Sequence, residues 1–357
     1  MPSKKRNHYI PRLLLRRFAF RETSKGQAYL WMLSKDKAVE VESKNAGVAS
    51  HFYGDPDNNV EDDLADVEAG WRGLLNEVDS GTNNLEHRRT DIWRFAWLLG
   101  MRTQASRGHF SAAVEKLLAE MATGATTTGI WCTSPFVERT IEEEWTRALA
   151  NVPVERRETI GNDSSLKREM LAAAREHFDA HAAALVRHLR EAGIGGAIAG
   201  VTQGQIRGMK ALLAQPDAPI DKFAPESWSV LSFAPHSVIL GDGVVFTVGQ
   251  DGLVGSVGRF KDDLEAIYVP VSHHQVLVGF RRGVSLLDVD AVNEASARLS
   301  RDYILASRNT SYETALRLQI GSAEPLISEA ERVDLLASVW RDLGHPGASG
   351  GTAPGSR

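Results

Sequence analysis

The sequence predicts an α+β fold, with an α-rich N-terminal half that contains a short hairpin and a mixed β/α C-terminal half. From about residue 60 to residue 191, apolar side chains recur at the three- and four-residue spacing of helices. After Pro216, short runs of β-branched and aromatic residues alternate with glycine, as strands and turns do. We therefore expect a mainly helical region at 1–215, a β-containing region at 216–343, and a disordered tail rich in Gly, Ala, Ser and Pro at 344–357.

The composition is that of a globular protein. Of the 357 residues, 43% are hydrophobic and 24% are charged, so the chain can bury a core. The single cysteine, Cys132, cannot form an intramolecular disulfide and excludes a zinc site built from several cysteines. There is no apolar run of about 18 residues, the length that a membrane span needs. We expect a cytoplasmic protein with no membrane partner, and the oligomeric state stays open.

The N-terminal segment differs in charge from the rest of the chain. Residues 1–25 hold eight basic side chains and one acidic one, a net charge of +7, whereas the whole chain carries −5. Such an asymmetry predicts either a polyanion-binding arm or a segment that folds onto an acidic body. A short helix starting at Pro11 would place three apolar residues on one face and three arginines on the others: Leu14, Leu15 and Phe18, against Arg12, Arg16 and Arg17.

A hairpin and two long helices follow. Residues 29–33 and 39–41 are strand-like and flank a polar turn. Residues 60–78 predict a helix with one apolar stripe, formed by Val60, Leu64, Val67, Trp71, Leu74 and Val78. Residues 88–121 predict a second helix that is apolar on more than one side, so we expect it in the centre of the fold.

The remaining elements are predicted from shorter patterns. Further helices are expected at 134–150, 164–192, 203–214, 289–301 and 328–343. Strands are expected at 228–233, 237–240, 244–248, 266–271, 275–280, 284–287 and 303–306.

Arg102 is the most informative residue of the helical half. It lies at helical spacing from Phe95, Leu98 and Leu99, so it projects from an apolar stripe and needs a partner. Glu61 and Glu68 share one face of the preceding helix, and either could be that partner. The alternatives are a structural salt bridge, or a surface pair of Glu68 with Arg72.

His8 is a candidate general acid or base, because an imidazole titrates near neutral pH. The neighbouring Lys5, Arg6 and Arg12 favour the neutral ring, which suits a base. The alternative is a solvated histidine in a flexible arm.

Asp242 lies in a Gly-Asp-Gly sequence between two strand-like runs, which is a hairpin-turn signal. A carboxylate at a strand end could also ligate a metal or accept a proton.

Motifs for cofactors give no assignment. The sequence lacks a phosphate-binding loop, a nucleophile elbow and a dinucleotide-binding glycine motif. His177, His181 and His188 share a helical stripe, but their neighbours are those of a solvated face rather than of a zinc site. The cofactor and any metal therefore stay unknown.

Several separated motifs resemble those of a widespread, mainly bacterial family of uncharacterised proteins, domain of unknown function 4238. These are His8-Tyr9-Ile10-Pro11, then His51-Phe52-Tyr53 ahead of Glu61 and Glu68, then the helix from Phe95 that ends in Arg102-Thr103. In the C-terminal half the matching positions are 241–244, 270–273 and Asn293, and the serine and proline that flank the family's aspartate are absent here. The resemblance covers about residues 6–310.

The resemblance supplies no activity, but it implies a grouping. Six polar residues that are far apart in the sequence would converge on one site: His8, Glu61, Glu68, Arg102, Asp242 and Asn293. If they do converge, a site explains them better than six separate structural roles.

The leading hypothesis is a site that acts on a phosphate-bearing ligand or nucleic acid, in its enzyme form a hydrolase. His8 would be the acid or base, Glu61 or Glu68 a proton or metal partner, Arg102 an anion clamp and Asp242 a further catalytic carboxylate. Ligand contacts would come from Arg6, Tyr9, Arg12, Thr103 and Asn293. The alternatives are a non-enzymatic nucleic-acid- or protein-binding module with a structural Arg/Glu network, and a basic segment that packs only against its own acidic body.

Overall fold

The computed structural model describes residues 6–53, 59–81, 85–127, 146, 149–157, 165, 168–169, 196, 200–214, 224–257, 264–281 and 283–323. The chain forms two compact units, one of residues 1–111 and 200–327, the other of residues 112–199 and 328–357. The first unit contains every predicted site residue. The predicted division at residue 215 stays a prediction, and the tail at 344–357 lies outside the described residues.

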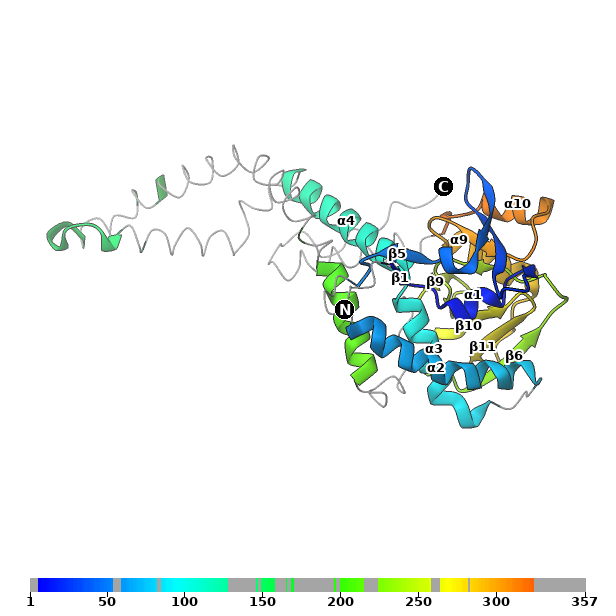
Figure 1. The fold of residues 1–357 in the computed structure, drawn as a ribbon. Helices are drawn as coiled ribbons and strands as arrows, with labels where there is room; N and C mark the ends of the chain where they lie inside the picture. The colour runs from blue at the N-terminus through cyan, green and yellow to red at the C-terminus, as the bar shows by residue number, and fades with distance from the viewer. Residues whose placement is uncertain are drawn as a thin grey trace. The chain divides into compact units, whose positions relative to one another are not determined.

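The basic N-terminal segment is folded into the first unit. Strand β1 (Arg6–His8) pairs antiparallel with β5 (Val48–Ser50), and Pro11 caps helix α1 (Arg12–Arg16). The predicted apolar face is buried, since Leu14, Leu15 and Phe18 are at most 1% exposed. Helix α1 packs against the hairpin that follows it in the chain (Figure 1). From Arg6 onward, the segment is therefore part of the core and not a free arm.

That hairpin belongs to a sheet built from distant parts of the sequence. Strands β3 (Ala28–Leu33) and β4 (Ala38–Glu42) form the predicted hairpin, and the short 3₁₀ helix η1 (Ser43–Asn45) follows it. The sheet order is β2-β3-β12-β7, with β4 also paired to β3. The three short members are β2 (Arg21–Glu22), β7 (Leu240–Gly241) and β12 (Ile304–Ala306).

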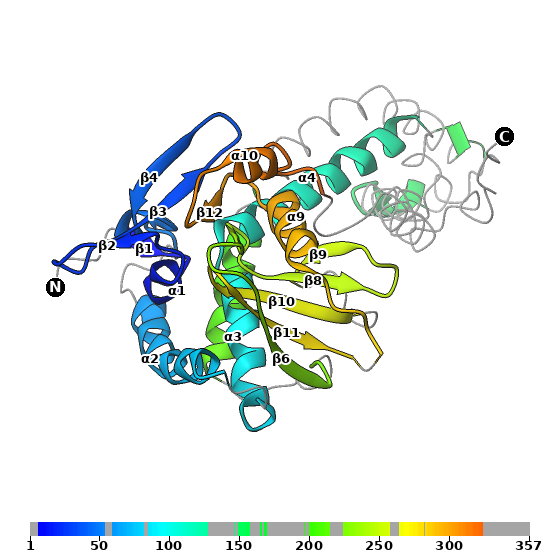
Figure 2. The ribbon, with the colours of Figure 1, turned by 90° about the vertical axis from the view of Figure 1, so that its right-hand side faces the viewer.

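A second antiparallel sheet lies in the C-terminal half, and Figure 2 shows its strands side by side. Its order is β6-β11-β10-β8-β9. The strands are β6 (Ser227–Ser232), β8 (Phe246–Gly249), β9 (Val254–Ser256), β10 (Leu264–Ser272) and β11 (Gln275–Phe280). Together with the helices, these antiparallel sheets confirm the predicted α+β class.

Two predicted strands are wrong, and each has a local reason. Residues 237–239 are not a strand, because the Asn293 side chain accepts from the amide of Ile239 and donates to the oxygen of Ser237. Residues 284–287 are not a strand either, since the amide of Leu287 donates to the hydroxyl of Tyr268. In both cases a side chain takes the backbone groups that a ladder would have used.

The N-terminal helices pack on one another and on the second sheet. Trp71 of α2 (Asn59–Asp79) meets Phe95 of α3 (Arg89–Met101) edge to face, with ring centroids 4.8 Å apart. The 3₁₀ helix η2 (Glu86–Arg88) leads into α3, whose Trp93 lies 6.4 Å from the ring of Trp228 in β6. The central position predicted for this helix is confirmed by its buried residues on several sides.

The predicted continuous helix at 88–121 is interrupted. Helix α3 ends at Met101 with Arg102 as its C-cap, and α4 (Gln104–Thr127) begins after Thr103. The hydroxyl of Thr103 accepts from the amide of Ser106 at 3.0 Å, which is the geometry of an N-cap that starts a new helix.

The C-terminal part adds two helices to the first unit. Helix α9 (Val289–Leu299) is capped by Asp288 and packs on β7, β8 and β9. Helix α10 (Ser311–Arg317) starts with a capping box of Thr310 and Glu313. Residues 200–214 are helical, as predicted from 203 onward. The helices predicted at 134–150, 164–192 and 328–343 lie largely or wholly outside the described residues.

Among the described residues, no helix combines the length and the hydrophobicity that crossing a bilayer requires.

We predict that Leu15→Ala lowers the free energy of unfolding by about 2–5 kcal/mol, because it leaves a cavity in the core. The matched variant Leu13→Ala, at a half-buried position of the same helix, costs clearly less. Urea denaturation of both variants measures the difference. Equal, small losses would mean that the segment is not integral to the fold.

Candidate functional site

Arg102 joins three segments of the chain at one buried point. Its side chain is 1% exposed. Nη1 donates to Oε1 of Glu68 in α2, and Nη2 donates to the backbone oxygen of His8 in β1, each at 2.6 Å. The partner among the two predicted glutamates is therefore Glu68. The contact also brings His8 to the same point, which the sequence pattern alone did not place there.

Tyr53 completes this contact. Its hydroxyl donates to the oxygen of His8 at 3.2 Å, so that oxygen accepts from both Tyr53 and Arg102. Burial alone would lower the pKa of Arg102, but Tyr53 and Glu68 outweigh it and raise that pKa, so the guanidinium stays charged. In the sequence, Tyr53 stood out only as a member of the His51-Phe52-Tyr53 motif. Its hydroxyl, which can donate a hydrogen bond from an otherwise aromatic pair, was the one signal for this role.

The imidazole of His8 is half-buried and has one free nitrogen. Nε2 is buried and finds no hydrogen-bond partner among the described residues. Burial lowers the pKa of His8, and the charges of Arg12 and Arg102 also lower it, whereas a hydrogen bond to the backbone of Lys44 and the charge of Glu68 raise it.

These facts fix the chemical state of the ring. The lowered pKa keeps His8 neutral at neutral pH. Because Nε2 is unpartnered, the hydrogen bond to the backbone of Lys44 comes from Nδ1, and the lone pair then lies on Nε2. A neutral imidazole with a free Nε2 lone pair can accept a proton or a hydrogen bond from a ligand.

Glu61 is reached through Asn7. The amide Nδ2 of Asn7 donates to Oε2 of Glu61 at 3.4 Å, and Oδ1 accepts from the backbone amide of Phe52 at 2.9 Å. Asn7 is 3% exposed, so the two bonds hold β1 to the residues before α2 and to α2 itself. No sequence signal distinguished Asn7 from its basic neighbours.

Arg107 fixes the turn that carries Tyr53. Its Nη2 donates to the oxygen of Phe52 at 3.0 Å, and its guanidinium carbon lies 3.8 Å from the centre of the Phe52 ring. Gln205 holds the guanidinium from the other side, with Oε1 2.7 Å from Nε. Sequence reasoning missed both residues, because their partners come from other segments.

Asp242 is buried and bound by backbone amides. Its side chain accepts from the amide of Arg301 at 2.9 Å, of Asp302 at 2.8 Å and of Tyr303 at 3.4 Å. Burial raises the pKa of Asp242 to about 7, while these amide hydrogen bonds act in the opposite direction. The carboxylate therefore anchors the chain segment that leads into β12.

The hairpin predicted around Asp242 is wrong. Residues 242–243 do form a turn, but β7 before it pairs with β12, whereas β8 after it pairs with β10 and β9. The turn connects two different sheets, and a local Asp-Gly signal cannot tell this corner from a hairpin.

Two tyrosines connect the Asp242 corner with the N-terminal segment. The hydroxyl of Tyr303 lies 2.9 Å from that of Tyr9, the residue after His8. The backbone of Tyr303 also meets Asp242, through Oδ2. Within the described residues, no hydrogen bond joins the Asp242 carboxylate directly to His8, Glu68 or Arg102.

The remaining predicted residues have contacts of other kinds. Asn293 holds the backbone of residues 237–239, and Thr103 caps α4. Arg6 donates to Asn45 at 3.3 Å on the surface, and Arg12 is exposed. Of the six grouped residues, the structure brings together His8, Glu68 and Arg102 by direct contact, and Glu61 through Asn7.

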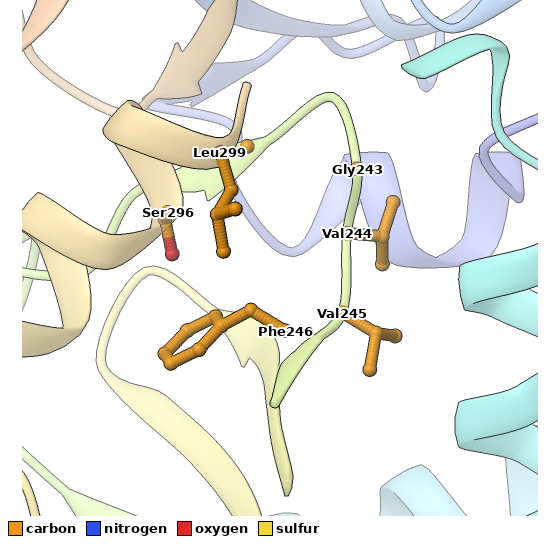
Figure 3. Close-up of a pocket in the computed structure, with 7 residues that line it drawn as sticks. Gly243, Val244, Val245, Phe246, Ser296 and Leu299 are labelled. Carbon is orange, nitrogen blue, oxygen red and sulfur yellow. The ribbon is translucent and has the colours of Figure 1, made fainter. Parts of the chain in front are cut away.

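A small pocket near the Asp242 turn does not contain these side chains. In Figure 3, Ser296 and Leu299 of α9 lie above the ring of Phe246. The rest of its lining is Gly241, Gly243, Val244 and Val245. Within the described part of the chain, no group of three or more His, Cys, Asp or Glu side chains could hold a metal ion.

We predict that Glu68→Ala lowers the free energy of unfolding by about 3 kcal/mol, because it leaves the buried Arg102 charge without its anionic partner. Asp66→Ala, at an exposed position of the same helix, stays within about 0.5 kcal/mol of the wild type. Chemical denaturation compares the two. A loss at Glu68 no greater than at Asp66 would contradict the role of this ion pair.

The lowered pKa of His8 predicts a pH dependence of stability. A histidine whose pKa is lower in the folded state than the unfolded value of about 6.5 stabilises the fold above that pH, and this contribution is lost as the pH falls through the folded pKa. The difference in unfolding free energy between wild type and His8→Asn therefore shifts against the wild type between pH 7 and acid pH. Urea denaturation across this range measures it, and a constant difference would refute it.

The comparison with known families covers most of the chain. The model of the family described as protein of unknown function (DUF4238) matches residues 6–310, from the first residue of β1 to the residue before α10. No curated protein and no solved structure matches the chain. The matched range includes every predicted site residue and most of the sequence. The chain therefore belongs to the DUF4238 family of proteins of unknown function.

Proposed function

We propose that the protein is a hydrolase that acts on a phosphate-bearing ligand, with His8 as its general base. The observation that carries the proposal is the buried, unpartnered Nε2 of a neutral imidazole. Buried polar atoms in proteins nearly always have a partner, so a free one suggests a group that arrives with the ligand. A water molecule bound to Nε2 would lose a proton to the ring as its oxygen attacks phosphorus, while the P–O bond to the ester group breaks and the departing oxygen takes up a proton.

In this proposal Glu68 and Arg102 are positioning residues. Both terminal nitrogens of Arg102 are already engaged, by Glu68 and by the oxygen of His8, so the guanidinium is poorly placed to clamp an anion. It holds the backbone of His8 instead, and this sets where the imidazole projects. Glu68 neutralises Arg102, and its own negative charge favours a protonated His8 after proton transfer.

Exposed arginines of the N-terminal segment supply the attraction for phosphate. Arg12 is exposed and close enough to His8 for its charge to lower the pKa of the imidazole. Arg16 and Arg17 are less available, because they pair with Glu22 and Asp79. A phosphate bound by Arg12 would therefore lie near His8.

Asp242 supports the site from a distance in this proposal. Its carboxylate binds the amides of residues 301–303, and Tyr303 in turn contacts Tyr9, next to His8. A direct catalytic role for Asp242 stays a prediction. A cytoplasmic location also belongs to the proposal, and the single cysteine is compatible with it.

A second candidate is a non-enzymatic module that binds nucleic acid through its basic surface. The contacts of Arg102 favour it, because a guanidinium whose two terminal nitrogens are both bound within the protein suits a structural role. Binding would then weaken steeply with salt, depend on Arg12 and proceed without turnover.

Turnover of bis(p-nitrophenyl) phosphate, a simple phosphodiester, tests the proposal. His8→Asn keeps an amide donor near the position of Nδ1 but removes Nε2, so we expect the rate to fall about 10²–10⁴-fold. The matched control His51→Asn, at an exposed histidine with φ +50°, keeps the wild-type rate, because asparagine tolerates this backbone conformation.

Two results would overturn the proposal. One is a folded wild type that releases no nitrophenol while binding nucleic acid in a salt-dependent way, which selects the second candidate. The other is a His8→Asn protein that retains the wild-type rate. An unfolded His8→Asn protein would assign His8 to structure, and circular dichroism of the variant separates that case from loss of a base.

A further inference from the structure

Two turns that are distant in the sequence close around each other in the C-terminal half. Residues 233–238 connect β6 to β7, and His273 and His274 form the turn between β10 and β11. The amide of Phe233 donates to the oxygen of His274 at 2.8 Å, and the amide of Val238 to the oxygen of His273 at 3.0 Å. Between these two bonds, the amide of His236 donates to the ring nitrogen Nδ1 of His273 at 2.9 Å.

His236 is held there in an unfavourable backbone conformation. Its φ is +64°, in the left-handed region that residues other than glycine seldom adopt. Its ring stacks on that of His273, with centroids 4.4 Å apart and planes 11° from parallel, and its Nδ1 lies 2.9 Å from the hydroxyl of the buried Ser307. Contacts with the rest of the protein, and not its own preference, keep the turn closed.

The central contact exists in one protonation state only. Nδ1 of His273 can accept the amide proton only if it carries a lone pair, so the ring is neutral with its hydrogen on Nε2. Protonation would place an N–H against the N–H of His236 and remove the bond. Because the rings of His273 and His236 stack with centroids 4.4 Å apart, a positive charge on one ring disfavours a positive charge on the other.

We propose that residues 233–238 form a pH-sensitive latch, closed by the neutral ring of His273 and opened when that ring takes up a proton. Opening would free the amide of His236 and release its left-handed backbone. It would stay local, because Asn293 fixes the oxygen of Ser237 and the amide of Ile239 independently of any histidine.

The surrounding charges place the opening at acid pH. Burial, together with the charges of His236, His274 and Arg17, lowers the pKa of His273 to about 4, against a backbone hydrogen bond that raises it. Asp79 lies close enough to His274 for their charges to interact, and it is bound to Arg17 through two hydrogen bonds of 2.6 and 2.7 Å. Ser272 and Ser307, the other polar neighbours of the rings, carry no charge.

Acid opens the latch because the closed state lowers the pKa of His273. The pKa of His273 is lower in the closed state than the value of about 6.5 expected for an exposed ring. Closure is therefore favoured above that pH and is lost as the pH falls toward about 4. Within this window, the opening equilibrium rises by about tenfold per pH unit, because one proton is taken up.

Hydrogen exchange of the hydrogen-bonded amides of this turn, those of Phe233, His236, Ser237 and Val238, tests the latch after correction for the intrinsic rate. In the wild type we expect protection to fall progressively between pH 7 and pH 4. His273→Asn retains an acceptor oxygen near the position of Nδ1 but cannot titrate, so its protection stays constant. His273→Phe keeps the stacking ring without an acceptor, so the turn is unprotected already at pH 7.

His274→Asn is the matched control, since His274 accepts no backbone amide through its ring, and it opens with pH as the wild type does. The latch is refuted if the wild type stays protected at pH 4, or if His273→Asn loses protection as the wild type does. If acid unfolds the whole unit first, urea denaturation decides: the wild type must lose more stability than His273→Asn between pH 7 and pH 5. None of these measurements depends on turnover.

Discussion

The guanidinium of Arg102 has to be neutralised where α3 ends, because no water reaches it there to solvate the charge. Glu68 from α2 and the oxygen of His8 from β1 meet this need together. The arrangement of three segments therefore follows from one charge. It also explains why the proposed base lies in a short strand near the N-terminus. Arg102 binds the backbone oxygen of His8, and this contact fixes the position of the His8 side chain as well.

The same constraint changes the meaning of the basic N-terminal segment. Three of its arginines form ion pairs within the protein, Arg16 with Glu22, Arg17 with Asp79 and Arg21 with Glu40. Its apolar face, around Leu15, is fully buried. An isolated count of charges suggests an arm for a polyanion, but the structure gives the segment a place in the core and leaves Arg12 as the arginine exposed beside His8.

Local periodicity made part of this predictable. The apolar stripe around Arg102 and the shared face of Glu61 and Glu68 follow from helical spacing alone, and both led to the Arg102–Glu68 pair. Asn7 and Tyr53 could not be found in this way, because each acts through a segment that only the folded chain brings near.

The incorrect predictions of a hairpin, a continuous helix and two strands also concern features that local sequence patterns do not show. An Asp-Gly turn has one local signature whether its flanking strands pair with each other or, as around Asp242, with strands of two different sheets. The break at Thr103 was within reach of sequence reasoning, since threonine is a common N-cap, but the unbroken apolar pattern on either side concealed it. The side chains of Tyr268 and Asn293 form hydrogen bonds with backbone groups of two predicted strands. Strand propensity does not predict such contacts.

Pairing between β3 and β12 sets the order in which the chain can fold. Ile304 lies opposite Leu33 in this ladder, and Tyr9 meets Tyr303 across a separation of 294 residues. Closing such a long loop costs entropy before any contact repays it, so folding should be slow for a chain of this size. During synthesis, β3 must wait for β12 to leave the ribosome. Until then part of this edge of the hairpin is unpaired, and an unpaired strand edge favours aggregation of a nascent chain.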